Sequence, residues 1–449
     1  SLKKENTLME NNNIDNLVYQ AVFGSDQEKQ QARFNIWKQG IKVGIIPSSI
    51  NDLYMARGRK DLPNTFTVPA MNLRGMTYER AKATFAAAKQ HNVSAMIFEI
   101  ARSEMAYTMQ SPQEYVSVIT AAALKEGWTG PQFIQGDHFQ AKAESPGKPK
   151  AGEIETIKNL IKESLQAGFY NIDIDMSTLV DLDKKTEAEE QIPNYKYSVE
   201  FTKYVRSLEP AEITVSLGGE IGHIGGKNST KEDFDAYIEG FQKELTKNMV
   251  GMSKVSVQTG TSHGGVVLAN GDLADINLDF SILKTITEIA QDKYQIGGSV
   301  QHGASTLPDE YFGQFKESKA LEVHLATGFQ NIQMNHPDFP EELLSEMYQY
   351  LDENKTDERK PDQTDEQFHY SLRKKTWGVF KKQCWNMPDE KKLKIRETLI
   401  KRFEFFFKEL NVVNSKEMVE KYIKPVIVTK TLADFAVGKA LKDVKGLSD

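Results

Sequence analysis

Half of the histidines in this chain lie where a predicted strand ends. The chain has 8 histidines, and these four are His138, His263, His302 and His324. Neutral imidazole is a preferred ligand of zinc, and a catalytic zinc usually has three protein ligands and one open position. Three imidazoles from separate strands could therefore meet at one metal ion. A purely structural role explains any one of these histidines better than it explains three beside glycines on separate strand ends.

The histidines belong to a repeated alternation of short apolar runs and amphipathic stretches. This pattern predicts eight strands at Thr65–Met71, Ser94–Ile100, Pro131–His138, Tyr170–Met176, Glu212–Gly219, Ser253–Gly260, Tyr294–His302 and Leu321–Thr327. Strands that alternate with helices indicate parallel βα units. The count of eight favours an α/β fold, the (β/α)8 TIM barrel, over a doubly wound open sheet. In such barrels the catalytic side chains collect where strands end and the next loops begin.

Both ends of the chain lie outside this alternation. We expect an N-terminal helical extension at residues 1–62, a TIM-barrel catalytic domain at 63–340 and a C-terminal helical extension at 341–449. The aromatic run Phe403–Phe407 is too apolar to face water, so it should pack on the barrel or on another subunit. We therefore expect a homo-oligomer.

Composition argues against several other classes of protein. The net charge is −7 with no long basic run, so nucleic-acid binding is a poor default. No apolar stretch is long enough to span a membrane, and the polar first residues lack the apolar core of a signal peptide. The single cysteine, Cys384, rules out an intramolecular disulfide and fits a reducing, cytoplasmic location. The expected partner is a small molecule.

Carboxylates and glycines accompany the histidines. Asp137, Asp175 and Glu220 lie at or next to the ends of predicted strands. Glycine lets the backbone approach a ligand closely, and consecutive N–H groups can hold an anion. The segments 264–265 and 303–305 are therefore candidates to bind a phosphate or sugar hydroxyls, although tight strand-to-helix turns explain the same glycines equally well.

Six short segments, in order along the chain, are similar to motifs of one enzyme family. VPAMNL resembles its first-strand VPAFN, QGDH its Asp-His pair, GGEIGHIGG its E-[IL]-G-x-[IL]-G-G segment, TGTSHG its GT-[AS]-HG, QHGAS its LHG-[GA]-S and VHLAT its VNVAT. On these motifs the chain is identified as a divergent member of the class II (zinc-dependent) fructose-bisphosphate and tagatose-bisphosphate aldolase family over roughly residues 65–335. FEIARSEMAYTMQSPQEYV also resembles the accessory subunits of tagatose-bisphosphate aldolase, which share the barrel and are thought to lack catalysis of their own.

The resemblance implies a role for each matched residue. Zn²⁺, or another divalent metal, would be bound by His138, His263 and His302, and a monovalent cation is a further candidate. Asp137 would carry protons at the scissile bond, and Asp175 and Glu220 would either bind a second metal or hydrogen-bond to the ligands of the first. The phosphate end of the substrate would meet Gly264, Gly303, Ser305 and Thr327, and Asn72 would lie on the floor of the site.

Aldol cleavage is chemistry that such a site can perform. Breaking the bond between carbons 3 and 4 of a ketose leaves an enediolate, which a zinc ion can stabilise as a Lewis acid. A lysine Schiff base is the other route, and no lysine stands at the predicted strand ends. Asp137 could take the proton from the carbon-4 hydroxyl, or it could instead orient a metal-bound imidazole.

Two departures from the family pattern concern the phosphorylated half of the substrate. No lysine or arginine follows His263 within a few residues, and His324 stands where the family has asparagine. The substrate therefore either lacks a phosphate at that end or holds it with other groups, for which Lys227 and Lys254 are candidates. His324 could donate a hydrogen bond to substrate, serve as a fourth metal contact, or be a core histidine bonded to backbone. The Gly-rich loop 225–233 is either a mobile loop over the substrate or a plain connection.

Three functions remain open at this stage. The first is a metal-dependent carbon–carbon lyase that acts on a ketose or ketose phosphate through a zinc-stabilised enediolate. The second is a sugar or sugar phosphate epimerase that cleaves and rejoins the same bond. The third is a non-catalytic aldolase accessory subunit, against which the complete set of histidines argues, because a protein without catalysis has no physical need for three converging imidazoles.

Overall fold

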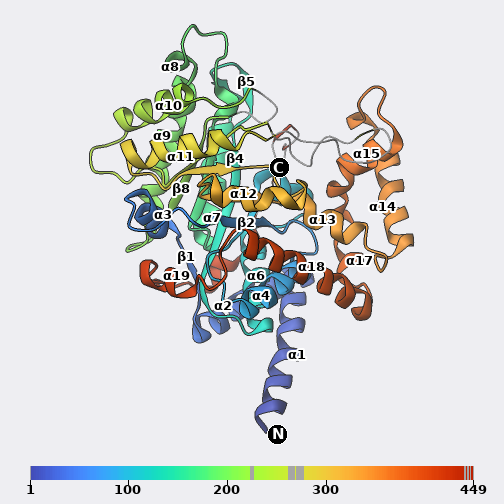
Figure 1. The fold of residues 1–449 in the computed structure, drawn as a ribbon. Coiled ribbons are helices and arrows are strands. Elements are labelled where there is room, and N and C mark those ends of the chain that lie inside the picture. Colours follow the sequence, from blue (N-terminus) through green and yellow to red (C-terminus); the bar gives the residue numbers. More distant parts are fainter. Residues whose placement is uncertain are drawn as a thin grey trace.

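Eight parallel strands close into a barrel in the computed structural model (Figure 1), which describes residues 2–222, 227–260, 268, 278–438, 441, 444 and 446–447. Each strand pairs with the next in chain order, and the last pairs with the first. The barrel strands are β2 (Val68–Asn72), β3 (Ile97–Ala101), β4 (Gly130–Gln140), β7 (Asn171–Asp175), β8 (Ser216–Glu220), β9 (Lys254–Val257), β10 (Ser299–Gln301) and β11 (Glu322–Leu325). All eight predicted strands are present with shifted ends, and the predicted (β/α)8 barrel is confirmed.

A helix follows every barrel strand and covers its outer face. In chain order these helices are α4 (Thr77–Gln90), α6 (Pro112–Glu126), α7 (Glu153–Ala167), α9 (Ile192–Leu208), α10 (Lys231–Glu244), α11 (Phe280–Tyr294), α12 (Phe312–Glu317) and α13 (Thr327–Met334). Helix α7 shows why they pack, because Ile157, Leu160, Ile161 and Leu165 recur at helical spacing and are all buried. Shorter elements in the connections are α5 (Arg102–Tyr107), β5 (Ala143–Ser145), β6 (Lys148–Pro149) and α8 (Glu187–Glu190).

Strand β4 carries a bulge just where the predicted catalytic residues lie. Its register against β7 shifts between Gly136 and Phe139, and His138 has a φ of 41°. In a regular strand successive side chains point to opposite faces, and a bulge changes this locally by inserting an extra residue. The bulge therefore explains how the neighbours Asp137 and His138 both reach the interior of the barrel.

Gly136 is needed for this bulge, because a Cβ there would overlap the ring of Phe139. We expect Gly136→Ala to lower the free energy of unfolding by about 1–3 kcal/mol, the usual cost of overpacking. Urea unfolding measures this change. Gly313→Ala is the matched control, because its Cβ would meet only the end of the flexible Glu409 side chain at 3.1 Å. Equal midpoints for the two variants would contradict this account of the bulge.

The N-terminal extension comprises α1 (Leu2–Phe23), α2 (Asp26–Val43), β1 (Ile45–Ser48) and α3 (Asn51–Gly58). Ser25 and Glu28 form a reciprocal capping box at the start of α2. Strand β1 is an addition to the mostly helical pattern read from the sequence. It pairs with the first residues of β4, and β7 pairs with the later residues of β4.

The C-terminal extension comprises α14 (Glu341–Asn354), α15 (Asp365–Leu372), α16 (Thr376–Val379), α17 (Lys381–Trp385), α18 (Asp389–Glu409) and α19 (Lys416–Tyr422). Helices α14 and α15 stand beside the barrel in Figure 1, whereas α18 packs along α4. The aromatic run lies on α18, where the ring of Phe403 is 4.8 Å from Phe329 and that of Phe406 is 4.8 Å from Phe312. The run therefore packs on the barrel of its own chain and gives no argument for a second subunit. None of the described helices is long and apolar enough to cross a membrane.

Candidate active site

Three imidazoles form a row at the carboxyl ends of the barrel strands. The ring centroids of His138 and His302 are 4.3 Å apart, and those of His302 and His324 are 4.0 Å apart. The three side chains come from β4, from the residue after β10 and from β11, and none is more than 4% exposed. The structure thus brings together three of the four histidines that the sequence placed at strand ends. His263, like Gly264, lies outside the described residues.

Two carboxylates hold the ring of His138. Its Nδ1 lies 2.9 Å from Asp175 Oδ2 and 3.3 Å from Glu220 Oε2. Burial alone would lower the pKa of His138, but the carboxylates of Asp137 and Glu220 raise it well above its usual value. Burial also opposes ionisation of Asp175, yet hydrogen bonds from His138, Ser177 and Gln140 lower its pKa. Asp175 is therefore placed to orient the imidazole as a carboxylate.

Donors from His138, Glu220 and His302 fit one divalent metal ion. One ligand atom from each lies within 4.8 Å of the others, and Glu220 Oε2 is 3.9 Å from His302 Nε2. Two ligand atoms at tetrahedral positions around zinc are separated by about 3.3 Å, so small side-chain movements suffice. Because burial and repulsion by Asp175 raise the pKa of Glu220 to about 8, a cation at this position would also relieve an unfavourable charge.

Asp137 lies between the three imidazoles. Its Oδ1 is 3.3 Å from His324 Nδ1, 3.9 Å from His138 Nε2 and 4.0 Å from His302 Nδ1. His324 is thus neither remote from the site nor bonded only to backbone. His324 Nε2 contacts Glu322 Oε1 at 2.6 Å. The carboxylates of Glu99, Asp137 and Glu322 raise the pKa of His324 despite its burial.

Below the histidines, a buried ionic network fills the barrel. Lys254 Nζ lies 3.0 Å from Asp173 Oδ1 and 2.5 Å from Glu322 Oε1. Glu322 also accepts a hydrogen bond of 2.5 Å from the hydroxyl of Tyr54. Burial raises the pKa of Asp173 to about 6 against the effect of Lys254, whereas Lys254 and His324 overcome burial and lower that of Glu322 to about 2. Lys254 is therefore enclosed in the barrel by its partners and is not placed to hold a substrate phosphate. Lys227 is 57% exposed and faces Glu190 and Asp233.

A second polar network joins two of the predicted substrate-binding residues, Asn72 and Thr327. Asn72 and Arg74 both donate hydrogen bonds to Glu104, and Arg74 also donates to Thr327 Oγ1 at 3.0 Å. In the neighbouring loop, Gly303 has a φ of 68° and Ser305 Oγ accepts a hydrogen bond from the N–H of residue 328. Arg74 belongs to none of the motifs above, and it brings a buried guanidinium next to the predicted phosphate end.

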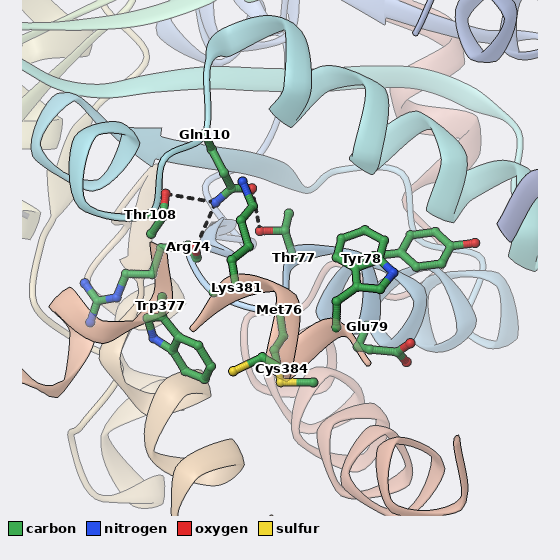
Figure 2. Close-up of a pocket in the computed structure, with 12 residues that line it drawn as sticks. Arg74, Met76, Thr77, Tyr78, Glu79, Thr108, Gln110, Trp377, Lys381 and Cys384 are labelled. Carbon is green, nitrogen blue, oxygen red and sulfur yellow. Dashed lines mark hydrogen bonds between the residues drawn. The ribbon is translucent and has the colours of Figure 1, made fainter. Parts of the chain in front are cut away.

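Two cavities border these networks. One, with a volume of about 520 Å³, adjoins the ends of β4, β7 and β8 and is lined by Gln140, which bonds to Asp175 at 2.6 Å, and by Lys227. The other, shown in Figure 2, lies between the turn after β2 and helices α16 and α17, and is lined by Met76, Trp377 and Cys384. Neither cavity is lined by a histidine of the row, but the first adjoins the strand ends and reaches the site through the bond from Gln140 to Asp175. It is therefore the candidate substrate site.

The raised pKa values predict how stability depends on pH. Burial, followed by repulsion from Asp137, raises the pKa of Glu99 from its ordinary 4.5 to about 8, and Glu220 reaches the same value. The folded protein therefore binds more protons than the unfolded chain between about pH 4.5 and 8, so its stability falls as pH rises through this window. We expect the melting temperature of chelator-treated protein to decrease from pH 6 to pH 9, and Glu99→Gln to flatten that slope. A melting temperature that rises with pH would contradict these assignments.

Comparison with known proteins agrees with the geometry. A family model for fructose-bisphosphate aldolase class-II matches residues 60–377. The solved fructose-bisphosphate aldolase from Campylobacter jejuni is 18% identical, with coverage of 83% of this chain and 97% of its own and a TM-score of 0.50. A probable tagatose 6-phosphate kinase from Sinorhizobium meliloti 1021 is 12% identical, with coverages of 79% and 99% and a TM-score of 0.52. At such identities both structures support the fold alone. No curated protein matches the chain.

Proposed function

Since the chain belongs to the class II fructose-bisphosphate aldolase family, we propose that it is a zinc-dependent aldehyde-lyase that cleaves a ketose or ketose phosphate. The observation that carries the proposal is the meeting of His138, Glu220 and His302 around one volume, with Asp137 beside it. His263, which follows from the family motif alone, completes the proposed histidine set. The expected setting is the cytoplasm, and the expected partner is a sugar or sugar phosphate.

Each residue has a defined part in the proposed reaction. Bound Zn²⁺ supplies a Lewis acid that polarises the ketone carbonyl and stabilises the negative charge left after cleavage. Asp137 accepts the proton of the carbon-4 hydroxyl as the bond between carbons 3 and 4 breaks, and returns it in the aldol direction. Asp175 fixes the ring of His138 through the contact at Nδ1. The enclosure of these side chains in the barrel excludes water from the reacting atoms.

The anionic end of the substrate is assigned to the loops after β10 and β11. Gly303, Ser305 and Thr327 supply the close backbone approach and hydroxyl groups, and Arg74 supplies a cation that already contacts Thr327. A guanidinium can pair with two phosphate oxygens at once. Arg74 thus takes the place of the basic residue that is missing after His263.

An epimerase would use the same residues, so product analysis must separate the two reactions. We propose to incubate the zinc-loaded protein with ketoses and ketose 1-phosphates and to follow the products by NMR. A three-carbon fragment supports the lyase. A change of configuration without fragments supports the epimerase. If neither appears and the protein instead activates an aldolase partner, it is an accessory subunit and the proposal fails.

A further inference from the structure

A second group of possible metal ligands adjoins the histidine row and shares His324 with it. This group, called the floor cluster here, consists of Glu99, Asp137, Asp173 and His324, and one ligand atom from each lies within 4.8 Å of the others. No member is more than 5% exposed. The cluster shares none of its members with the His138, Glu220 and His302 group.

The spacing within the floor cluster is that of ligands around one ion. His324 Nδ1 lies 3.1 Å from Glu99 Oε2 and 3.3 Å from Asp137 Oδ1. Ligand atoms bound at about 2.0–2.2 Å with angles between 90° and 110° are separated by about 2.8–3.6 Å. Asp173 Oδ2 is somewhat farther, at 3.7 Å from the other nitrogen of His324.

The charges around the floor cluster do not balance. Four buried carboxylates, those of Glu99, Asp137, Asp173 and Glu322, contact His324, and Lys254 pairs with two of them, Asp173 and Glu322. Lys254 and a charged His324 together leave two negative charges in excess, and a His324 that binds metal as a neutral imidazole leaves three. Uncompensated charge in a protein interior is too costly to persist, so protons or a bound cation must offset it.

One oxygen of Glu99 is an independent indication of a ligand. Glu99 is fully buried, and its Oε2 accepts a hydrogen bond from Gln135 at 2.9 Å. Its Oε1 accepts none from any residue within the described part of the chain. A buried carboxylate oxygen without a donor is rare in proteins, and a metal ion is one of the few groups that satisfies it.

We propose that the floor cluster binds a second divalent cation, separate from the ion of the histidine site. Carboxylate oxygens form most of the donor set and a single imidazole nitrogen completes it, which suits Mn²⁺ better than a metal that prefers thiolates. The cation offsets two of the three excess negative charges and uses the open oxygen of Glu99. The proposal does not depend on lyase activity, because ion binding is measured without substrate.

The test counts ions in metal-stripped, full-length protein titrated with Mn²⁺, by calorimetry and by elemental analysis after dialysis. We expect two ions per chain in the wild type. His138→Ala should remove the histidine-site ion and keep the other. Glu99→Gln, which preserves the shape of the side chain, should weaken Mn²⁺ binding at the floor cluster at least about 10-fold and keep the histidine-site ion.

Glu322→Gln is the matched control, because it removes a buried negative charge of the same network without removing a proposed ligand. It should retain both ions, and thermal unfolding checks that each variant is folded. One ion per chain in the wild type, with no effect of Glu99→Gln, would overturn the floor site and show that protons offset the charge. Equal loss in Glu99→Gln and Glu322→Gln would overturn the ligand assignment. An unchanged ion count in His138→Ala would instead count against the proposed function.

Discussion

Asp137→Asn is expected to lower kcat by about 10²–10⁴-fold, the range contributed by a positioned general acid–base group. Asparagine keeps the shape of the side chain but cannot accept the hydroxyl proton. The ion between His138 and His302 should stay bound, because its proposed ligands, His138, Glu220 and His302, do not include Asp137. Steady-state kinetics, together with metal analysis of the same sample, measures both effects.

The control for Asp137→Asn is Glu99→Gln. Asp137 and Glu99 share the floor cluster, so loss of a floor-site ion would affect both variants alike. If kcat falls in Asp137→Asn but not in Glu99→Gln, and KM stays close to that of the wild type, Asp137 is the proton carrier. If Asp137→Asn lost the histidine-site ion as well, Asp137 would be a residue that holds the site together and the proton would have another acceptor.

His302→Ala is expected to reduce activity more than about 100-fold together with the affinity for divalent metal, since loss of even an indirect metal contact often costs 10–100-fold. His302 lies in the middle of the imidazole row, with its ring 4.3 Å from that of His138 and 4.0 Å from that of His324, and it belongs to the proposed metal group with His138 and Glu220. Metal content, and recovery of activity at millimolar Zn²⁺, are the measurements.

His369→Ala provides the comparison, because His369 stacks on Tyr348 at 4.5 Å in the C-terminal extension and lies outside the metal groups. It should keep full metal content and activity. A His302→Ala variant that retained both would mean that the imidazole row is structural, whatever its geometry.

The barrel could be predicted from the sequence because each strand has a local sequence pattern. A short apolar run followed by a helical pattern is visible eight times, and every one of these strands forms. Strand ends were predicted less well, since runs such as Tyr294–His302 include turn residues that a local pattern does not separate from β10 (Ser299–Gln301). The local pattern also indicates Asp137 and His138 as site residues. It does not indicate the bulge that turns both side chains inward, because a bulge depends on the register with a neighbouring strand.

Some acidic residues of the barrel interior were not selected from the sequence, for a different reason. Asp173 and Glu322 each lie two residues before a selected residue on the same strand, Asp175 and His324, and alternation places such pairs on one face. That signal was available. The ion pairs of Lys254 with Asp173 and Glu322 could not be predicted in this way, because they join three strands across the barrel interior. Lys254 was therefore considered for phosphate binding, although its side chain belongs to the barrel floor.

Cleavage of the carbon–carbon bond should depend on bound metal. Protein stripped with a chelator should release no three-carbon fragment from its ketose substrate, and stepwise addition of Zn²⁺ should restore cleavage in proportion to the ion bound at the histidine site. The His302→Ala variant should not respond at the same zinc concentrations. Cleavage that continues at the wild-type rate in stripped protein, or that His302→Ala leaves intact, would contradict the account.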